Sequence, residues 1–390
     1  MKIICKLQII IFILALISCS QKKIRLSADF ERGSIGAMEE TGPGYFKGNT
    51  RHWMKWDNIG NQYYWFYFRA ENVTGCRLTV ELNDLIGVYR GNPHIVYTDY
   101  TQPVFSYDRQ NWERITEVAY DSAARRFTFT QQFDRQPVWI AYAHPYTYSR
   151  LEEFTKSVGG VSGLEVRTLS KTAEGRDIRM FFITDAAVPV RDKKTILVIA
   201  AQHAGEDAGA FLAEGLVSFL ISDSPEAAEC RNKFNYAVVP LMNPDGFYHG
   251  ITRYNSKMED LNSIWTESTR SQPEVEGVKA WVNEWQAPGN KIDLFIDVHN
   301  HTQFHDYHIF IMEDNSLDSM AATVNKYWPV RTWHSLFAGS SCAWTFRQGI
   351  PSATIELSQG KIGEDHYLAI DDFLGYGKGT AEGLREYFYP

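Results

Sequence analysis

The sequence is poor in cysteine and has no excess of positive charge, and each absence excludes a class of protein. Five Cys in 390 residues are too few for a fold held together by disulfides. Lys and Arg number 39 against 47 Asp and Glu, which gives a net charge of −8. Proteins that bind nucleic acid by neutralising phosphates are normally basic, so the composition predicts no nucleic-acid partner.

The first apolar run is too short to cross a bilayer. Ile9–Ile17 has nine residues, whereas a spanning helix needs about 20. Lys2 and Lys6 flank the start of the chain, and the run ends in Leu16-Ile17-Ser18-Cys19, which resembles a bacterial lipobox. We therefore expect a lipoprotein signal peptide at 1–18, a tether at 19–26, and attachment to a membrane of the bacterial cell envelope through a lipidated Cys19. An ordinary secretory signal is the alternative.

The remaining composition is that of a globular chain with two domains. Hydrophobic residues make up 44% and charged residues 22%, and 390 residues exceed the size of one ordinary domain. Residues 27–150 contain short β-rich runs separated by turn residues, which predict an antiparallel β-sandwich. The predicted strands lie at 62–68, 77–82, 126–130 and 137–142.

Residues 151–390 show a different pattern, in which buried strands alternate with helices. Continuous apolar runs predict strands at 195–201, 236–240, 292–297, 309–312 and 353–356. Helical periodicity predicts helices at 207–221, 273–286 and 380–388. This order predicts an α/β domain with a mixed, mainly parallel sheet flanked by helices, whose functional residues collect where strands end.

Three predicted strands are followed by, or end in, residues suited to metal chemistry. His203 and Glu206 follow the first of these strands, His299 follows the strand that ends at Asp297, and Glu356 ends another. Two imidazoles and one carboxylate form a ligand set typical of catalytic zinc. Asp297 is placed to fix the ring of His299, although His301, His305 and His308 leave open which imidazole binds.

Six short motifs follow one another along the second domain. They are Glu174-Gly175-Arg176, His203-Ala204-Gly205-Glu206, Asn243-Pro244-Asp245-Gly246, Asp260-Leu261-Asn262, Asp297-Val298-His299-Asn300-His301 and Thr354-Ile355-Glu356-Leu357. Taken in order, they resemble the motifs of the zinc carboxypeptidases of the carboxypeptidase A type. The resemblance covers essentially all of 151–390, and the β-rich first domain is similar to the cytosolic carboxypeptidase branch. A junction similar to that of the branch lies at Pro145-Tyr146-Thr147-Tyr148-Ser149.

The resemblance implies a metallocarboxypeptidase that hydrolyses a C-terminal amide bond of a peptide substrate. His203, Glu206 and His299 would bind one Zn²⁺ per chain. Glu356 would be the base that takes a proton from the metal-bound water. Arg253 would polarise the scissile carbonyl, and Asn262 would bind the terminal carboxylate of the substrate.

Two departures from the family pattern keep other functions open. Ser263 stands where the family usually has Arg, so the carboxylate clamp is missing unless Lys257 or Arg270 replaces it. The segment Trp333–Phe337 contains His334 but lacks the mobile Tyr of many members. One rival is an amidase that acts on peptidoglycan or modified peptides with the same machinery. Another is a non-catalytic binding lipoprotein that uses the aromatic sandwich.

Overall fold

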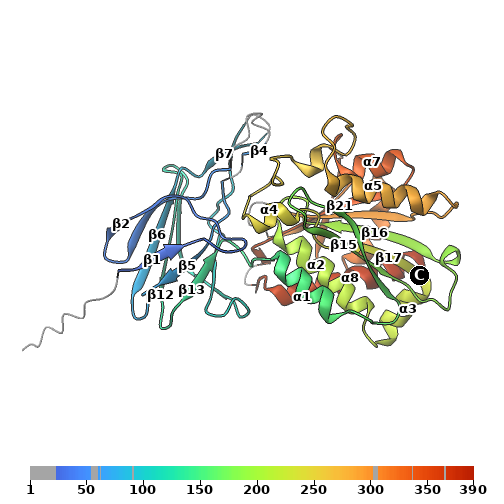
Figure 1. Ribbon diagram of the computed structural model, residues 1–390, viewed down its shortest axis with the longest axis horizontal. Helices are drawn as coiled ribbons and strands as arrows, with labels where there is room; N and C mark the ends of the chain where they lie inside the picture. Colours follow the sequence, from blue (N-terminus) through green and yellow to red (C-terminus); the bar gives the residue numbers. More distant parts are fainter. Residues whose placement is uncertain are drawn as a thin grey trace, which may run out of the picture.

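The computed structural model describes residues 23–53, 60–61, 63–89, 92–301, 306–335, 337–363 and 366–390. These residues form a β-rich N-terminal domain and a larger α/β domain, which lie side by side along the long axis of the molecule (Figure 1). The predicted signal peptide and Cys19 lie outside the described residues.

The N-terminal domain contains two five-stranded sheets packed over an aromatic core. One sheet is antiparallel throughout, with the order β1 (Arg25–Ser27), β5 (Tyr67–Glu71), β13 (Val138–Ala141), β9 (Val104–Ser106), β10 (Glu113–Arg114). The other has the order β11 (Glu117–Asp121), β12 (Arg126–Gln132), β6 (Arg77–Asn83), β3 (Tyr45–Asn49), β2 (Met38–Gly42), and only its β3–β6 pair is parallel. A small third sheet joins β4 (Gly60–Asn61), β7 (Ile86–Tyr89) and β8 (Asn92–Ile95). The predicted β-sandwich is confirmed.

The second domain is built on an eight-stranded mixed sheet. Its strand order is β14 (Leu164–Lys171), β15 (Asp177–Ile183), β17 (Phe234–Val239), β16 (Lys194–Ala200), β18 (Leu294–Asn300), β21 (Ser352–Leu357), β19 (His308–Met312), β20 (Val330–His334). The four central strands β17, β16, β18 and β21 are parallel, whereas β14, β15 and β19 form antiparallel pairs. This architecture confirms the predicted α/β fold.

Helices cover both faces of the sheet because its central strands are apolar on both sides. On one face lie α1 (Tyr148–Ser157), α2 (Asp207–Leu220), α3 (Pro225–Lys233), α6 (Asp318–Val324) and α8 (Ile370–Phe388). On the other face lie α5 (Pro273–Gln286) and α7 (Ser341–Arg347). Short elements complete the domain: α4 (Pro244–Tyr248), 3-10 turns at Val190–Asp192, Leu261–Ser263 and Asn315–Leu317, and the hairpin β22 (Lys361–Ile362) and β23 (His366–Tyr367).

Helix α8 begins at Ile370, well before the predicted start at Thr380. The sequence prediction missed this part because its glycines weaken helix propensity. Close packing explains one of them: a Cβ on Gly377 would lie 2.3 Å from the backbone of α2 at Leu212 and Leu216. The missing side chain therefore lets α8 and α2 approach each other closely.

Two elements begin on the other side of a predicted boundary. Helix α1 begins at Tyr148, before the predicted domain boundary at 150, and β1 begins at Arg25, inside the predicted tether. The strand predicted at 62–68 is confirmed only at its end, because the strand β5 starts at Tyr67. The backbone carbonyl of Tyr64 instead accepts a hydrogen bond from the Tyr97 hydroxyl at 2.8 Å. The Tyr64 side chain also lies against Gly205 of the α/β domain, as described below.

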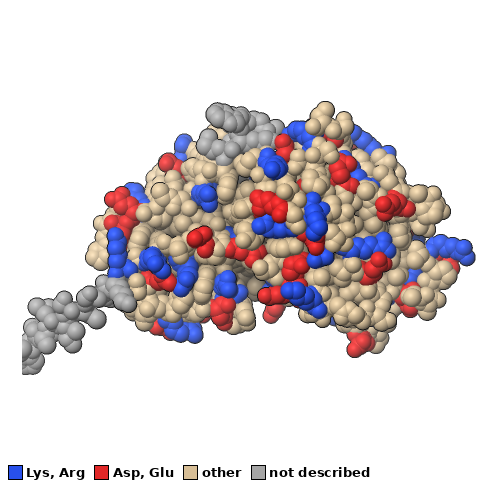
Figure 2. All heavy atoms as spheres, in the orientation of Figure 1, with Lys and Arg blue, Asp and Glu red and all other residues tan. Residues whose placement is uncertain are grey.

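The surface carries charges of both signs. On the face shown in Figure 2, Lys and Arg side chains are interspersed with Asp and Glu over both domains. In the part of the chain that the structure describes, none of the helices combines the length and apolar character that a membrane span requires.

Candidate metal and catalytic site

The predicted ligands lie at one edge of the sheet because they follow or end neighbouring parallel strands. The strand β16 ends at Ala200, and the loop that contains His203 and Glu206 leads from it into α2. The strand β18 runs parallel to β16, with Ala200 opposite Val298, so His299 extends just beyond the end of β16. Parallel strands end at the same edge of a sheet, which brings the three side chains together.

The donor atoms of His203, Glu206 and His299 lie within 4.8 Å of one another, and all three side chains are buried. The Glu206 carboxylate lies between the two rings, with Oε1 2.7 Å from Nδ1 of His203 and Oε2 2.7 Å from Nδ1 of His299. Two imidazole nitrogens and one carboxylate, converging in a buried position, fit the ligand set of catalytic zinc.

A carboxylate lies next to the second nitrogen of each imidazole. His203 Nε2 lies 3.2 Å from Asp260 Oδ1, and His299 Nε2 lies 3.0 Å from Asp297 Oδ2. Such carboxylates fix the tautomer and orientation of metal-binding rings. Asp297 has the position that the sequence predicted. The role of Asp260 was missed, although it lies in a motif that the sequence analysis noted.

The charges of this cluster support one another. Burial by itself would raise the pKa of Glu206, but the two imidazoles outweigh this effect and the net pKa lies below the usual range. Burial opposes ionisation of Asp260 as well, yet Arg253 and His203 hold its pKa below the usual value. The surrounding charges therefore favour the ionised form of both carboxylates, and a metal ligand such as Glu206 must be ionised.

Glu356 lies beside the cluster on β21. It is the direct partner of His299 across the parallel β18–β21 pair, and the side chains of such partners project from the same face. Loss of hydration raises the pKa of Glu356, and the charge of Glu206 raises it further, although His299 opposes the shift. A carboxyl with a raised pKa next to a metal site is suited to proton transfer.

Arg253 and Asn262 also border the cluster. Arg253 Nε donates to Asp260 Oδ2 at 2.7 Å, so this arginine is joined to His203 through one carboxylate. Asn262 Nδ2 lies 3.1 Å from His299 Nε2, and its Oδ1 accepts from the backbone N–H of Ser341 at 3.0 Å. The structure thus brings both predicted substrate-binding residues to the predicted metal ligands.

The cations proposed to replace the missing arginine differ in their surroundings. Ser263 is buried, and its hydroxyl donates to the Asp260 carbonyl at 2.9 Å. Arg270 makes two hydrogen bonds of 2.8 Å to Glu267 and one of 3.4 Å to Glu259, so carboxylates of the chain already neutralise it. Lys257 is exposed.

The other histidines named by the sequence have different positions. His308 is buried between Trp328 and Tyr376, and its Nδ1 accepts from the Ser358 N–H. His334 is paired with Asp318 at 2.8 Å on the surface. His301 is not in the donor cluster found among the described residues, and His305 lies outside them.

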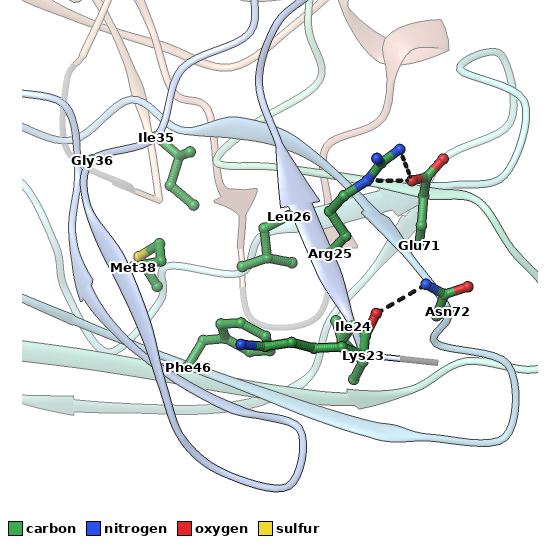
Figure 3. A pocket seen from close by; sticks show the side chains of 10 residues that line it. All are labelled: Lys23, Ile24, Arg25, Leu26, Ile35, Gly36, Met38, Phe46, Glu71 and Asn72. Carbon is green, nitrogen blue, oxygen red and sulfur yellow. Dashed lines mark hydrogen bonds and ion pairs between the residues drawn. The ribbon is translucent and has the colours of Figure 1, made fainter. Parts of the chain in front are cut away.

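A separate hollow of about 650 Å³ opens in the N-terminal domain beside β1 (Figure 3). Its walls are mainly apolar side chains: Ile24, Leu26, Ile35, Met38 and Phe46. The charges of Arg25 and Glu71 at its edge are paired with each other. None of the residues that line this hollow is a predicted metal ligand or catalytic residue.

Comparison with known proteins agrees with this geometry. Residues 160–318 match the family model of zinc carboxypeptidases, and residues 26–143 match that of the cytosolic carboxypeptidase N-terminal domain. Cytosolic carboxypeptidase 6 of Mus musculus is 28% identical over 72% of this chain and 54% of its own length. The chain therefore spans about half of that curated relative.

Solved structures show the same two-domain fold. A metallo-carboxypeptidase from Burkholderia cenocepacia is 21% identical with a TM-score of 0.81, covering 94% of this chain and 99% of that one. One from Pseudomonas aeruginosa is 23% identical with a TM-score of 0.73, covering 93% and 99%. The fold, the matched models and the ligand cluster together support a peptide hydrolase. The similarity to zinc carboxypeptidases covers residues 160–318, and the similarity to the cytosolic carboxypeptidase N-terminal domain covers residues 26–143.

Proposed function

We propose that the protein is a zinc-dependent metallocarboxypeptidase that hydrolyses a C-terminal amide bond of a peptide. The observation that carries this proposal is the convergence of His203, Glu206 and His299 within 4.8 Å. Arg253 and Glu356 border that cluster, in a domain matched by the zinc carboxypeptidase model. One Zn²⁺ per chain is the proposed cofactor.

The proposed roles follow from charge and position. His203, Glu206 and His299 would hold a Zn²⁺ that lowers the pKa of a coordinated water and supplies positive charge at the reacting carbonyl. Glu356 accepts the proton of the attacking water and returns it to the leaving amine. The guanidinium of Arg253 stabilises negative charge on the carbonyl oxygen, and Asn262 donates to the terminal carboxylate.

A second candidate is an amidase for peptidoglycan or other modified peptides. Ser263 favours it because its side chain is neutral and cannot pair with a free carboxylate. Arg270 favours it because its charge is already paired with Glu267. A non-catalytic binding lipoprotein is the third candidate. It gives no account of Glu356 and Arg253 beside a complete ligand set.

The proposed location is the bacterial cell envelope, with membrane attachment through lipidated Cys19. Support comes from the lipobox-like sequence Leu16-Ile17-Ser18-Cys19 after a short apolar run. A tether of a few residues would then place the sandwich close to the membrane, with the metal site on the far domain (Figure 1).

The direct test incubates purified full-length protein with peptides of varied C-termini and identifies the products by mass spectrometry. We expect zinc-dependent loss of a C-terminal residue, which a chelator stops and which the Glu356→Gln variant lacks. Cleavage of amidated or branched peptides alone would favour the amidase. A zinc-loaded protein that cleaves none of the peptides would refute the carboxypeptidase proposal.

A further inference from the structure

The N-terminal domain contacts the loop that carries two of the proposed zinc ligands. Tyr64 lies directly against Gly205, where a Cβ would come within 2.0 Å of the Tyr64 hydroxyl oxygen. The other wall is Thr252, whose carbonyl oxygen would be 2.7 Å from the same Cβ. Gly205 is thus confined between the two domains, and its position constrains Glu206, the next residue.

A buried ion pair joins the domains one residue beyond Glu206. Arg32 of the N-terminal domain donates from Nη2 to Asp207 Oδ2 at 2.6 Å and from Nε to Asp207 Oδ1 at 3.3 Å. Arg32 is 0% exposed and Asp207 is 1% exposed. Asp207 Oδ1 also accepts from the Tyr146 N–H at 2.7 Å. The first residue of α2 is therefore held in place by three hydrogen bonds.

Arg32 itself is fixed from both domains. Its guanidinium carbon lies 3.9 Å from the ring centroid of Trp65 and 4.3 Å from that of Phe247. The backbone N–H of Arg32 donates to the Tyr248 carbonyl at 2.8 Å, and its own carbonyl accepts from Trp65 Nε1 at 3.3 Å. The guanidinium therefore presents a rigid, preorganised fork to Asp207.

A gain in folding stability does not explain why this ion pair is buried. Burying two charges costs desolvation that their attraction only roughly offsets, and apolar residues of equal volume often stabilise as well or better. The cost here includes Arg32 Nη1, which is buried and has no hydrogen-bond acceptor among the described residues. The pair instead fixes the orientation of Asp207. Asp207 is the residue next to Glu206, the proposed ligand whose carboxylate must point at two imidazoles.

We propose that Arg32 is a positioning residue of the metal centre, through which the N-terminal domain orients Glu206 and sets the affinity for zinc. The inference rests on the proposed zinc site. It predicts that the N-terminal domain contributes to metal binding. Arg32 holds Asp207, and Asp207 fixes the N-terminus of α2, from which the Glu206 carboxylate reaches the two imidazole rings.

The test replaces the pair without leaving a lone buried charge, in the double variant Arg32→Met with Asp207→Asn. The matched control is the double variant Arg150→Met with Glu214→Gln on the same helix. Arg150 also donates two hydrogen bonds, of 2.6 and 3.0 Å, to a carboxylate of α2, that of Glu214. That pair lies seven residues along α2, about 10 Å from Asp207. Zinc affinity is measured in full-length protein by competition with a chromogenic chelator, and unfolding temperature is measured in parallel.

We expect the Arg32 and Asp207 variant to bind zinc at least tenfold more weakly, the usual scale for residues that support metal ligands. The control should change zinc affinity less than twofold, whatever its unfolding temperature. Equal zinc affinity in the two double variants would overturn the inference. The Arg32–Asp207 pair would then only hold the two domains together. If the double variant does not fold, Arg32→Lys keeps the charge but loses the fork, and unchanged zinc affinity there would overturn the inference as well. Wild-type protein that binds no zinc would instead refute the proposed function.

Discussion

Replacing the terminal carboxylate of a substrate by an amide tests the most unusual feature of the site, which is Ser263. A desolvated carboxylate needs a charged partner, and an arginine offers two parallel hydrogen bonds. Ser263 has a neutral hydroxyl that already donates to the Asp260 carbonyl at 2.9 Å. The nearby Arg270 is held by Glu267 through two bonds of 2.8 Å. Neither Ser263 nor the paired Arg270 therefore supplies the cation that would distinguish an acid from its amide.

The size of the effect follows from the bond that is missing. A hydrogen bond to a charged group contributes about 1.5–3 kcal/mol, which corresponds to a factor of roughly 10 to 150 in affinity. With Ser263 in place, we expect kcat/KM for a free acid to exceed that for the matched amide by less than about tenfold. Ser263→Arg should raise the ratio toward the upper part of the range.

The assay compares matched acid and amide peptides for the wild-type protein and for Ser263→Arg, Lys257→Met and Arg270→Met. Near-equal rates on acid and amide in the wild type would support the reasoning. A wild-type preference above a hundredfold would refute it, and the variant that abolished this preference would identify the cation involved. A loss in Lys257→Met would assign the role to an exposed side chain.

Four further outcomes are expected. His203→Ala should abolish stoichiometric zinc by elemental analysis, and full occupancy would contradict the ligand assignment. Glu356→Gln should keep zinc but lower kcat by about 10² or more, since Gln cannot accept the proton; a near-normal kcat in zinc-loaded protein would exclude Glu356 as the base. Burial raises the pKa of Glu274 in the folded protein to about 7, whereas its pKa in the unfolded chain is about 4.5. Between these two pH values only the folded protein keeps the proton, so the free energy of unfolding falls as the pH rises. Glu274→Gln should therefore raise the free energy of unfolding at pH 8 by up to about 3 kcal/mol, with no gain near pH 4, in denaturant titrations; an equal effect at both values would contradict this origin. Cys19→Ala should abolish metabolic labelling with a palmitate analogue, and unchanged labelling would leave an ordinary secretory signal.

The sequence alone predicted the two-domain organisation, the type of each domain and the candidate ligands. Buried parallel strands are readable because they are continuous apolar runs, and their ends show where functional side chains gather. His203, Glu206, His299 and Glu356 could be proposed from that pattern and from the family resemblance. The pattern of strand ends left His301, His305 and His308 open as alternatives to His299, and only the family resemblance favoured His299.

Tertiary structure decided what depends on contacts between distant segments. Only the folded chain brings Asp260 to His203, 57 residues earlier, and Arg32 to Asp207, 175 residues later. The glycines of α8 argue against a helix until the backbone of α2 is seen 2.3 Å from where a Cβ would lie. Local sequence patterns show which face of a helix or strand is apolar. An ion pair buried between two domains produces no such periodic pattern. Each partner is a single polar residue, and the other domain is what buries it.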